Sequence, residues 1–212
     1  MEELHARLDD YLHDLARHRD PLLEKMEERA AKSQFPIIGP IAGRFCYQVA
    51  RMLKARRIFE LGSGFGYSTL WFARAVAENG GGEVYHTVWD EELSNVARSY
   101  LNEAGLSHLV HFRVSEAVQA LRESEGLFDV IFNDIEKDGY PASLPVIKGH
   151  LRPGGALLVD NMFWGGRVFD PRNRESSTAG VREVTRLIYE DPDWFPSMLP
   201  LRDGVLLALK KE

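Results

Sequence analysis

Cysteine is almost missing from the sequence: among 212 residues, Cys46 stands alone. A single cysteine excludes an intramolecular disulfide, so the chain is not a small disulfide-stabilised secreted domain. We expect Cys46 to behave as a small buried apolar residue, and a reducing, cytoplasmic compartment fits this composition. A chain of this length can bury a sizeable core without disulfides or structural metal ions.

Long apolar runs are missing as well, since none approaches the ~20 residues of a membrane span. Residues 1–20 carry charges throughout, so we expect neither a membrane helix nor a signal peptide. An excess of basic residues is also lacking, because 26 Lys and Arg stand against 32 Asp and Glu, a formal net charge of −6. This charge argues against general nucleic-acid binding but leaves room for a local basic patch.

The N-terminal part of the chain is predicted as helices. The first helix places five apolar side chains on one face at helical spacing. They are Leu4, Leu8, Tyr11, Leu12 and Leu15. A second helix should begin at Pro21, with Asp20 as its N-cap. Residues 33–43 (SQFPIIGPIAG) interrupt the pattern with two prolines and two glycines before a further helix through Tyr47.

From residue 56 onward, short apolar strands alternate with helical segments. Five strands are predicted, at residues 56–61, 83–89, 109–114, 128–134 and 154–161. Such alternation indicates crossover units and a parallel sheet. After a helix at residues 179–190, two further strands at 194–201 and 204–211 are so close in sequence that they must pair antiparallel.

The predicted fold is therefore a doubly wound, Rossmann-like α/β domain. Its seven-stranded sheet is mostly parallel and ends in an antiparallel C-terminal hairpin. The chain contains no repeat, low-complexity tract or linker and has the length of one domain. We expect residues 1–54 to form a helical cap that belongs to the same domain, and residues 55–212 to form its main body.

Ligands of such sheets bind beyond the carboxyl ends of the strands. The first strand ends in a glycine loop, FELGSGFGYS at residues 59–68, which allows a tight turn and a close approach to the backbone. A dinucleotide fingerprint would require glycine where Tyr67 stands. Glu60 can accept hydrogen bonds from a ligand ammonium group or from N–H groups of the loop. The alternative is a plain strand–helix turn.

Acids and an amide follow the fourth and fifth predicted strands. Asp134 ends one strand, and Asp160 and Asn161 end the other. If the two strands are adjacent and parallel, these side chains converge. Three oxygen ligands with room for water suit Mg²⁺, with Ca²⁺ or Mn²⁺ as alternatives. A lone acid at a strand end is more often a helix cap.

The glycine loop resembles the first motif of class I S-adenosylmethionine-dependent methyltransferases. ELGSGFGYSTL, the run Asp134-Ile135-Glu136-Lys137-Asp138-Gly139-Tyr140 and the later Asp160-Asn161 together resemble bacterial members of the catechol and caffeoyl-CoA O-methyltransferase family. The resemblance covers residues 30–212. It implies S-adenosylmethionine as cofactor, with the loop around its methionine portion. The implied loop residues are Glu60, Gly62, Ser63, Gly64, Gly66, Tyr67 and Ser68.

The resemblance also implies an acid after the second strand that binds the ribose, but Val88 occupies this position. Either Asp90 reaches the ribose or cofactor affinity is lower, while Trp89 would cover the adenine. Asp90 is alternatively a helix N-cap. After the third strand, the family's Gly-Asp-Ala is replaced by the cofactor-binding candidates Ser115, Glu116 and Ala117. Glu116 would accept the adenine amino group, or Ser115 would be an N-cap with Glu116 in the first helical turn.

The mechanism implied by the resemblance uses Asp134 and Lys137 as catalytic residues. A cation held by Asp134, Asp160 and Asn161 binds two adjacent substrate oxygens and lowers the pKa of the hydroxyl. Lys137 accepts the proton or stabilises the phenolate. Asp134 would also border the cofactor. The alternative for Lys137 is a solvated lysine in the first turn of a helix. We expect Asp138 to cap the helix that runs through Tyr140.

The sequence thus predicts a metal-dependent O-methyltransferase that acts on a catechol-like aromatic molecule and forms a homodimer, as relatives often do. Alternative acceptors are a hydroxylated tRNA uridine or a CoA ester, which basic residues of the loop at 162–178 would contact. These are Arg167, Arg172 and Arg174. Phe163 and Trp164 of the same loop would wall the substrate or pack in the core. Two rival functions are a NAD-dependent oxidoreductase and a non-catalytic protein that binds S-adenosylmethionine.

Overall fold

The computed structural model describes residues 7, 11–12, 14–16 and 20–212. Leu4 and Leu8 of the predicted first helix lie outside the described residues. Of the same predicted apolar face, Tyr11 and Leu15 are exposed. Ala16 is buried instead, and its carbonyl oxygen accepts a hydrogen bond from Arg44. The face at Tyr11 and Leu15 is therefore not the one that packs on the rest of the molecule.

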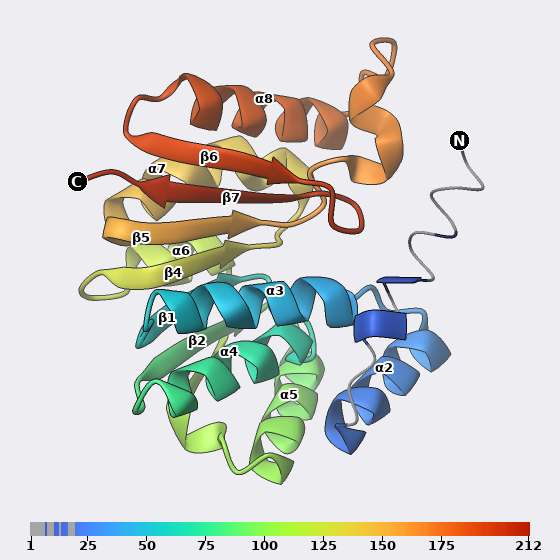
Figure 1. The fold of residues 1–212 in the computed structure, drawn as a ribbon, viewed down its shortest axis with the longest axis vertical. Coiled ribbons are helices and arrows are strands. Elements are labelled where there is room, and N and C mark those ends of the chain that lie inside the picture. Colours follow the sequence, from blue (N-terminus) through green and yellow to red (C-terminus); the bar gives the residue numbers. More distant parts are fainter. Residues whose placement is uncertain (1–6, 8–10, 13, 17–19) are drawn as a thin grey trace.

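The sheet has seven strands in the order β3-β2-β1-β4-β5-β7-β6 (Figure 1). The strands are β1 (Arg57–Leu61), β2 (Glu83–Val88), β3 (Val110–Val114), β4 (Phe128–Asn133), β5 (Leu151–Val159), β6 (Trp194–Leu199) and β7 (Val205–Lys210). The first five are parallel to one another, and β7 is antiparallel to both β5 and β6. The predicted fold class is confirmed, although β5 begins three residues earlier than predicted.

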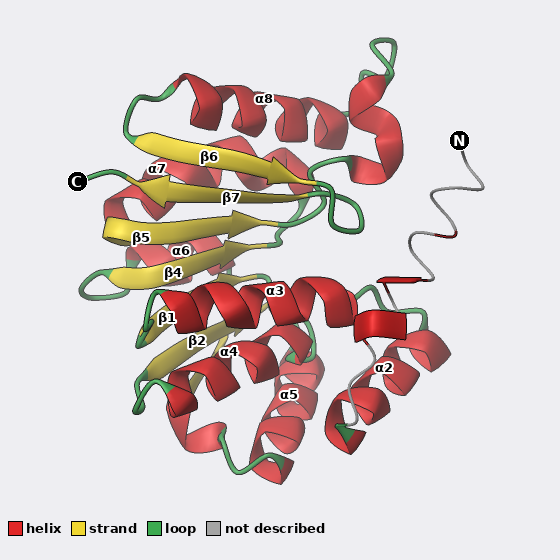
Figure 2. Cartoon of the chain, in the orientation of Figure 1, coloured by secondary structure: helices red, strands yellow, loops and turns green. Residues whose placement is uncertain are grey.

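Helices cover both faces of the sheet, as Figure 2 shows. The α-helices are α2 (Pro21–Ser33), α3 (Gly39–Met52), α4 (Tyr67–Glu78), α5 (Glu91–Glu103), α6 (Ala117–Arg122), α7 (Tyr140–His150) and α8 (Ser176–Glu190). The short 3₁₀ helices among the described residues are η1 (Ser107–Leu109), η2 (Lys137–Gly139) and η3 (Trp164–Phe169). Within the described residues, no helix is long and apolar enough to cross a membrane.

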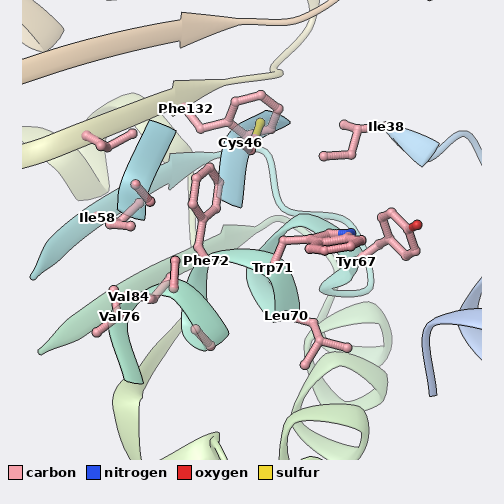
Figure 3. Close-up of a cluster of buried hydrophobic side chains, with 14 of the residues drawn as sticks. Ile38, Cys46, Ile58, Tyr67, Leu70, Trp71, Phe72, Val76, Val84 and Phe132 are labelled. Carbon is pink, nitrogen blue, oxygen red and sulfur yellow. The ribbon is translucent and has the colours of Figure 1, made fainter. Parts of the chain in front are cut away.

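Two apolar cores lie on opposite sides of the sheet because strand side chains alternate between its faces. Ile58 and Phe132 face the core under α3 and α4, whereas Phe59 and Ile131 face the core under α6, α7 and α8. Figure 3 shows the first of these cores, with Cys46 of α3 beside Phe132. The expectation that Cys46 is a buried apolar residue is confirmed, since it is 1% exposed.

The N-terminal helices are tied to the sheet by caps and close packing. α2 begins at Pro21, and Asp20 Oδ1 accepts hydrogen bonds from the backbone of Leu22 (3.0 Å) and Leu23 (3.3 Å), as the sequence predicted. α3 begins at Gly39, inside the segment predicted to interrupt the helices. It lies so close to α4 that a Cβ at Gly43 would overlap the Trp71 ring. The boundary between residues 54 and 55 stays a prediction.

The loops that carry the candidate site residues lie at one edge of the sheet. The carboxyl ends of the parallel strands reach this edge, and β7 starts from it because Leu206 pairs with Val159 in the antiparallel register. The turn from β6 to β7 therefore lies beside the end of β5. Figure 1 shows the arrowheads of β4, β5 and β6 on the same side as this turn.

Candidate functional site

The glycine loop joins β1 to α4 and packs directly against the end of β4. Gly62, Gly64 and Gly66 all have positive φ angles. A Cβ at Gly62 would lie 2.5 Å from the carbonyl oxygen of Asp134, while the backbone N–H of Asp134 donates to Leu61 O (2.8 Å). Only glycine allows this approach. The ends of the first and fourth strands are therefore in contact.

Glu60 is fully buried beneath this loop. Neither of its carboxylate oxygens has a hydrogen-bond partner among the described residues. Burial raises the pKa of Glu60 to about 7, and the hydroxyl groups of Ser68, Thr69 and Ser63 limit the rise although none reaches hydrogen-bond geometry. A buried acid without partners is costly, by about 1–3 kcal/mol or more, so it marks a place where a ligand can donate hydrogen bonds.

Two other loop residues are held by neighbouring elements. Tyr67 is buried, and its hydroxyl donates to Glu27 Oε1 of α2 (2.5 Å). Ser63 Oγ accepts a hydrogen bond from the backbone N–H of Thr87 in β2 (3.0 Å). The Phe35 ring, in the segment between α2 and α3, lies against Gly64. This segment thus borders the glycine loop, as a wall of the site would.

The acids after β2 and β3 both cap helices. Asp90 Oδ1 accepts from the backbone N–H groups of Glu92 (2.7 Å) and Leu93 (3.1 Å) at the start of α5. Glu116 caps α6 with its side chain. The suggestion that Ser115 is the cap is wrong, because Glu116 takes that position.

The hydroxyl of Ser115 is buried and has no hydrogen-bond partner within the described residues. Its backbone N–H donates to Val88 O (3.0 Å). Ser115 therefore lies beside the position where the resemblance implied a ribose-binding acid. Ala117 is buried at the first position of α6. Trp89, in contrast, is 74% exposed at the end of β2. Its ring is available to a ligand that lies over this edge of the sheet.

Lys137 is buried next to Asp134. Its Nζ atom donates to Asp134 Oδ1 (2.8 Å) and to the carbonyl oxygen of Ile135 (3.1 Å). It also lies 5.2 Å and 5.5 Å from the ring centroids of Tyr140 and Trp164. Because Lys137 is only 7% exposed, the alternative of a solvated lysine is wrong. The related expectation for Asp138 is also wrong, since Asp138 lies inside η2 and Gly139 precedes α7.

Asp160 lies at the end of β5 and is 2% exposed. Its Oδ2 atom lies 3.5 Å from Nη1 of Arg202, and its Oδ1 atom has no hydrogen-bond partner in the described part of the chain. Burial, and then the negative charge of Asp134, raise the pKa of Asp160 to about 6. Burial also raises the pKa of Asp134, against the effect of Lys137. The two predicted metal-binding acids are therefore near enough to repel each other.

Asn161, the third predicted metal ligand, adopts a positive φ angle of 55°. Its side-chain amide donates to Asp203 Oδ2 (3.4 Å), and Asp203 also accepts from the backbone N–H of Gly165 (2.7 Å). The Tyr140 hydroxyl donates to the carbonyl oxygen of Asp160 (2.9 Å). Hydrogen bonds from two sides thus fix the backbone that carries Asp160 and Asn161.

The donor set fits a hard divalent cation. No group of three or more His, Cys, Asp or Glu residues among those described is arranged to hold a metal ion. The predicted set instead consists of two carboxylates and one amide. The free oxygen of Asp160 and the repulsion between Asp134 and Asp160 are features that a bound cation would relieve. Asp134, Asp160 and Asn161 are the residues that would hold it.

Arg202 and Asp203 are site residues that the sequence analysis missed. Both lie in the turn between β6 and β7, which reaches the site because β7 runs antiparallel to β5. The predicted hairpin contained this signal, since its turn had to return to the strand ends that carry Asp160. Trp164 was expected to line the substrate or the core. Its ring contacts Lys137, and its Nε1 atom donates to Ser177 Oγ (3.0 Å).

The three arginines expected to contact an anionic acceptor lie in different surroundings. Arg172 pairs with Asp170 and its side chain is 91% exposed, while Arg167 lies over the Trp164 ring. Arg174 is exposed. The loop that carries them is fastened by Arg182 of α8, whose guanidinium donates to backbone carbonyl groups of Arg167, Val168, Asp170 and Asn173.

Known proteins that are similar to this chain include O-methyltransferases. Residues 13–211 match the family model described as O-methyltransferase. The chain is 29% identical over 220 residues to a catechol O-methyltransferase of Niastella koreensis, covering 99% of both chains. It is 32% identical to a putative O-methyltransferase of Mycolicibacterium vanbaalenii, covering 90% of this chain and 84% of the relative.

Solved structures of O-methyltransferases are similar to this chain as well. An O-methyltransferase from Bacillus cereus in complex with SAH has a TM-score of 0.87 and 29% identity, covering 97% of both chains. TomG from Streptomyces achromogenes, an O-methyltransferase involved in tomaymycin synthesis and solved with SAM, has a TM-score of 0.84 and 29% identity, covering 97% of this chain and 96% of TomG. This chain therefore belongs to the family of S-adenosylmethionine-dependent O-methyltransferases, as its glycine loop and strand-end acids predicted.

Proposed function

We propose that this enzyme transfers the methyl group of S-adenosylmethionine to a hydroxyl group of a catechol-like small molecule and uses a divalent cation, Mg²⁺ before Mn²⁺ or Ca²⁺. The observation that carries the proposal is the contact between the glycine loop and Asp134, which pairs with the buried Lys137. This contact would bring the methyl donor next to the acceptor site at the end of β4. The acceptor site would combine polar groups with the aromatic rings around Lys137. The similarity to a catechol O-methyltransferase supports the acceptor class.

Glu60 would accept hydrogen bonds from the ammonium group of the cofactor, because its buried oxygens have no partner among the described residues. Gly62, Gly64 and Gly66 would let the cofactor approach the backbone, with Ser63, Tyr67 and Ser68 around them. On the adenosine side, Trp89 would stack on the adenine, and Ser115, Glu116 and Ala117 would border it. Asp90 would reach the ribose with the oxygen that does not cap α5.

Methyl transfer requires a deprotonated acceptor oxygen that is aligned with the sulfonium methyl group. Asp134, Asp160 and Asn161 would hold a divalent cation, whose charge would lower the pKa of the acceptor hydroxyl group. Lys137 Nζ would accept the hydroxyl proton or stabilise the phenolate. Its position between the Tyr140 and Trp164 rings shields it from water. Asp134 would orient Lys137 through their 2.8 Å hydrogen bond and border the cofactor.

A hydroxylated tRNA uridine or a CoA ester remains the alternative acceptor, and the exposed Arg172 and Arg174 would meet its phosphates. The family assignment gives no support to a NAD-dependent oxidoreductase. A non-catalytic protein that binds S-adenosylmethionine is the remaining alternative, which an activity assay decides. A cytoplasmic homodimer also stays a prediction of the sequence, and sedimentation of the purified protein would measure its oligomeric state.

The test is transfer of labelled methyl groups to a panel of catechols, CoA esters and hydroxylated tRNA, with Mg²⁺ or with EDTA. We expect transfer to a catechol that EDTA abolishes. The Lys137→Ala and Asp160→Ala variants should lose at least about 100-fold in kcat, the usual contribution of a positioned acid or base. Lys148→Ala is the matched control, since Lys148 pairs with Asp191 and Asp193 instead. Full activity in both site variants, or no transfer to any catechol, would contradict the proposal.

A further inference from the structure

Arg202 stands at an unusual backbone position. It lies in the turn between β6 and β7 with a φ angle of 51°, in the left-handed region that favours glycine. The turn is fixed on both sides, because Gly204 N–H donates to Leu201 O (2.9 Å) and the Asp203 side chain holds Asn161 and Gly165. A non-glycine residue in such a conformation is strained, and strained positions often serve a binding site.

The side chain of Arg202 points toward the acids of the site. Its Nη1 atom lies 3.5 Å from Asp160 Oδ2, and its Nε atom passes next to Gly39 at the start of α3. Lys137 is paired with Asp134 in the same site. Lys137 and Arg202 therefore place one positively charged side chain beside each of Asp134 and Asp160 before any cation from solution binds.

The contact between Arg202 and Asp160 is loose. It is a single contact at the long end of the hydrogen-bond range, and Asp160 Oδ1 lacks a partner among the described residues. The pair formed by Arg152 and Asp129 shows the contrast. There, Nε lies 2.6 Å from Oδ1, and Oδ2 accepts from the backbone N–H groups of Arg56 and Arg57. The Arg202 guanidinium is thus placed so that another cation can displace it.

We infer that Arg202 is a built-in competitor of the divalent cation for Asp160. Its guanidinium neutralises Asp160 when the cation is absent and moves away when the cation binds. This positioning role weakens cation affinity and lets the cation exchange between turnovers. The inference rests on the cation site of the proposed function, to which it adds a residue that would set how tightly the cation is held.

Calorimetric titration of the purified protein with Mn²⁺ tests the inference without a methyl acceptor. In Arg202→Gln, the loss of a positive charge beside the site should lower the dissociation constant for Mn²⁺ by about tenfold or more. Arg202→Gly should do the same and should also fold readily, because glycine is unstrained at a positive φ angle. Arg202→Lys keeps the charge and should remain near the wild type. Arg152→Gln is the matched control and should leave Mn²⁺ binding unchanged.

The outcomes separate the inference from the cation site itself. Equal Mn²⁺ affinity in the wild type, Arg202→Gln and Arg202→Gly, combined with weaker binding by Asp160→Asn, would overturn the role of Arg202 and leave the cation site standing. An absence of saturable binding in every variant, Arg202→Gly included, would overturn the cation site and the inference with it. Binding that appears only after Arg202 is replaced would support the inference in its strongest form.

Discussion

At the scale of single residues, Glu60 shows how burial converts a side chain into a binding group. Its carboxylate lies under the glycine loop, and neither oxygen has a hydrogen-bond partner among the described residues. The pKa of about 7 means that, without a ligand, this acid is partly protonated at neutral pH. A cationic ammonium group in the site would favour the charged form, so cofactor binding and proton release should be linked.

Glu60→Gln should flatten the dependence of stability on pH. Because the folded pKa lies above the ordinary value of 4.5, the folded state holds its proton longer than the unfolded state does. The free energy of unfolding therefore falls as pH rises from about 4.5 to 7, by up to about 3 kcal/mol for a shift of this size. Urea unfolding between pH 5 and pH 8 measures this. A wild-type curve as flat as that of the variant would show that Glu60 does not titrate in this window.

At the scale of elements, the position of Lys137 depends on how α8 packs. Gly180 of α8 lies so close to η2 that a Cβ there would overlap the carbonyl oxygen of Lys137. Gly149 of α7 offers a comparison, because its added Cβ would have open space around it. Both glycines are in helices and neither has a positive φ angle, so the difference between them lies in packing alone.

Gly180→Ala should force α8 and η2 apart and displace Lys137. We expect a loss of about 1–3 kcal/mol in stability, the usual cost of overpacking, and a lower kcat with little change in the affinity for S-adenosylmethionine. Gly149→Ala should be neutral or stabilising by up to about 1 kcal/mol, because alanine favours helix. Urea unfolding and steady-state kinetics measure both variants. If both lose activity equally, contact with Lys137 is not the cause.

The sequence was sufficient to predict most of the helices and strands. The strongly periodic alternation of strands and helices predicted the sheet and its hairpin, and Asp20 before Pro21 predicted the cap of α2. The acids at the ends of β4 and β5 were placed for the same reason. The contacts between side chains could not be predicted from the sequence. Nothing local in the sequence says that Lys137 is buried between Tyr140 and Trp164, or that Arg202 reaches Asp160.

At the scale of the whole molecule, the site is assembled from segments that are far apart in the sequence. The glycine loop, the ends of β4 and β5 and the turn before β7 each contribute groups to it. A ligand that spans these segments binds only the folded state, so it stabilises the protein as a unit. The identity of that ligand can therefore be read from unfolding of the intact protein.

S-adenosylmethionine and S-adenosylhomocysteine should raise the midpoint of thermal unfolding, whereas NAD should not. At a ligand concentration 100 times the dissociation constant, the expected gain is about 2.7 kcal/mol in the free energy of unfolding. Differential scanning calorimetry with each ligand measures the shift. The Glu60→Gln variant should need more S-adenosylmethionine for the same gain. Stabilisation by NAD instead would contradict the proposed cofactor.

Because Cys46 of α3 is buried, labelling of its thiol can report local opening of the fold. Its thiol is 1% exposed within the core shown in Figure 3, and burial raises the pKa of that thiol. A maleimide reagent needs both access and a thiolate, and the closed molecule offers neither. Because the chain has no other thiol to react, the rate of labelling counts excursions in which α3 leaves the sheet. The same burial that protects the Cys46 thiol in the folded state makes each such excursion chemically visible.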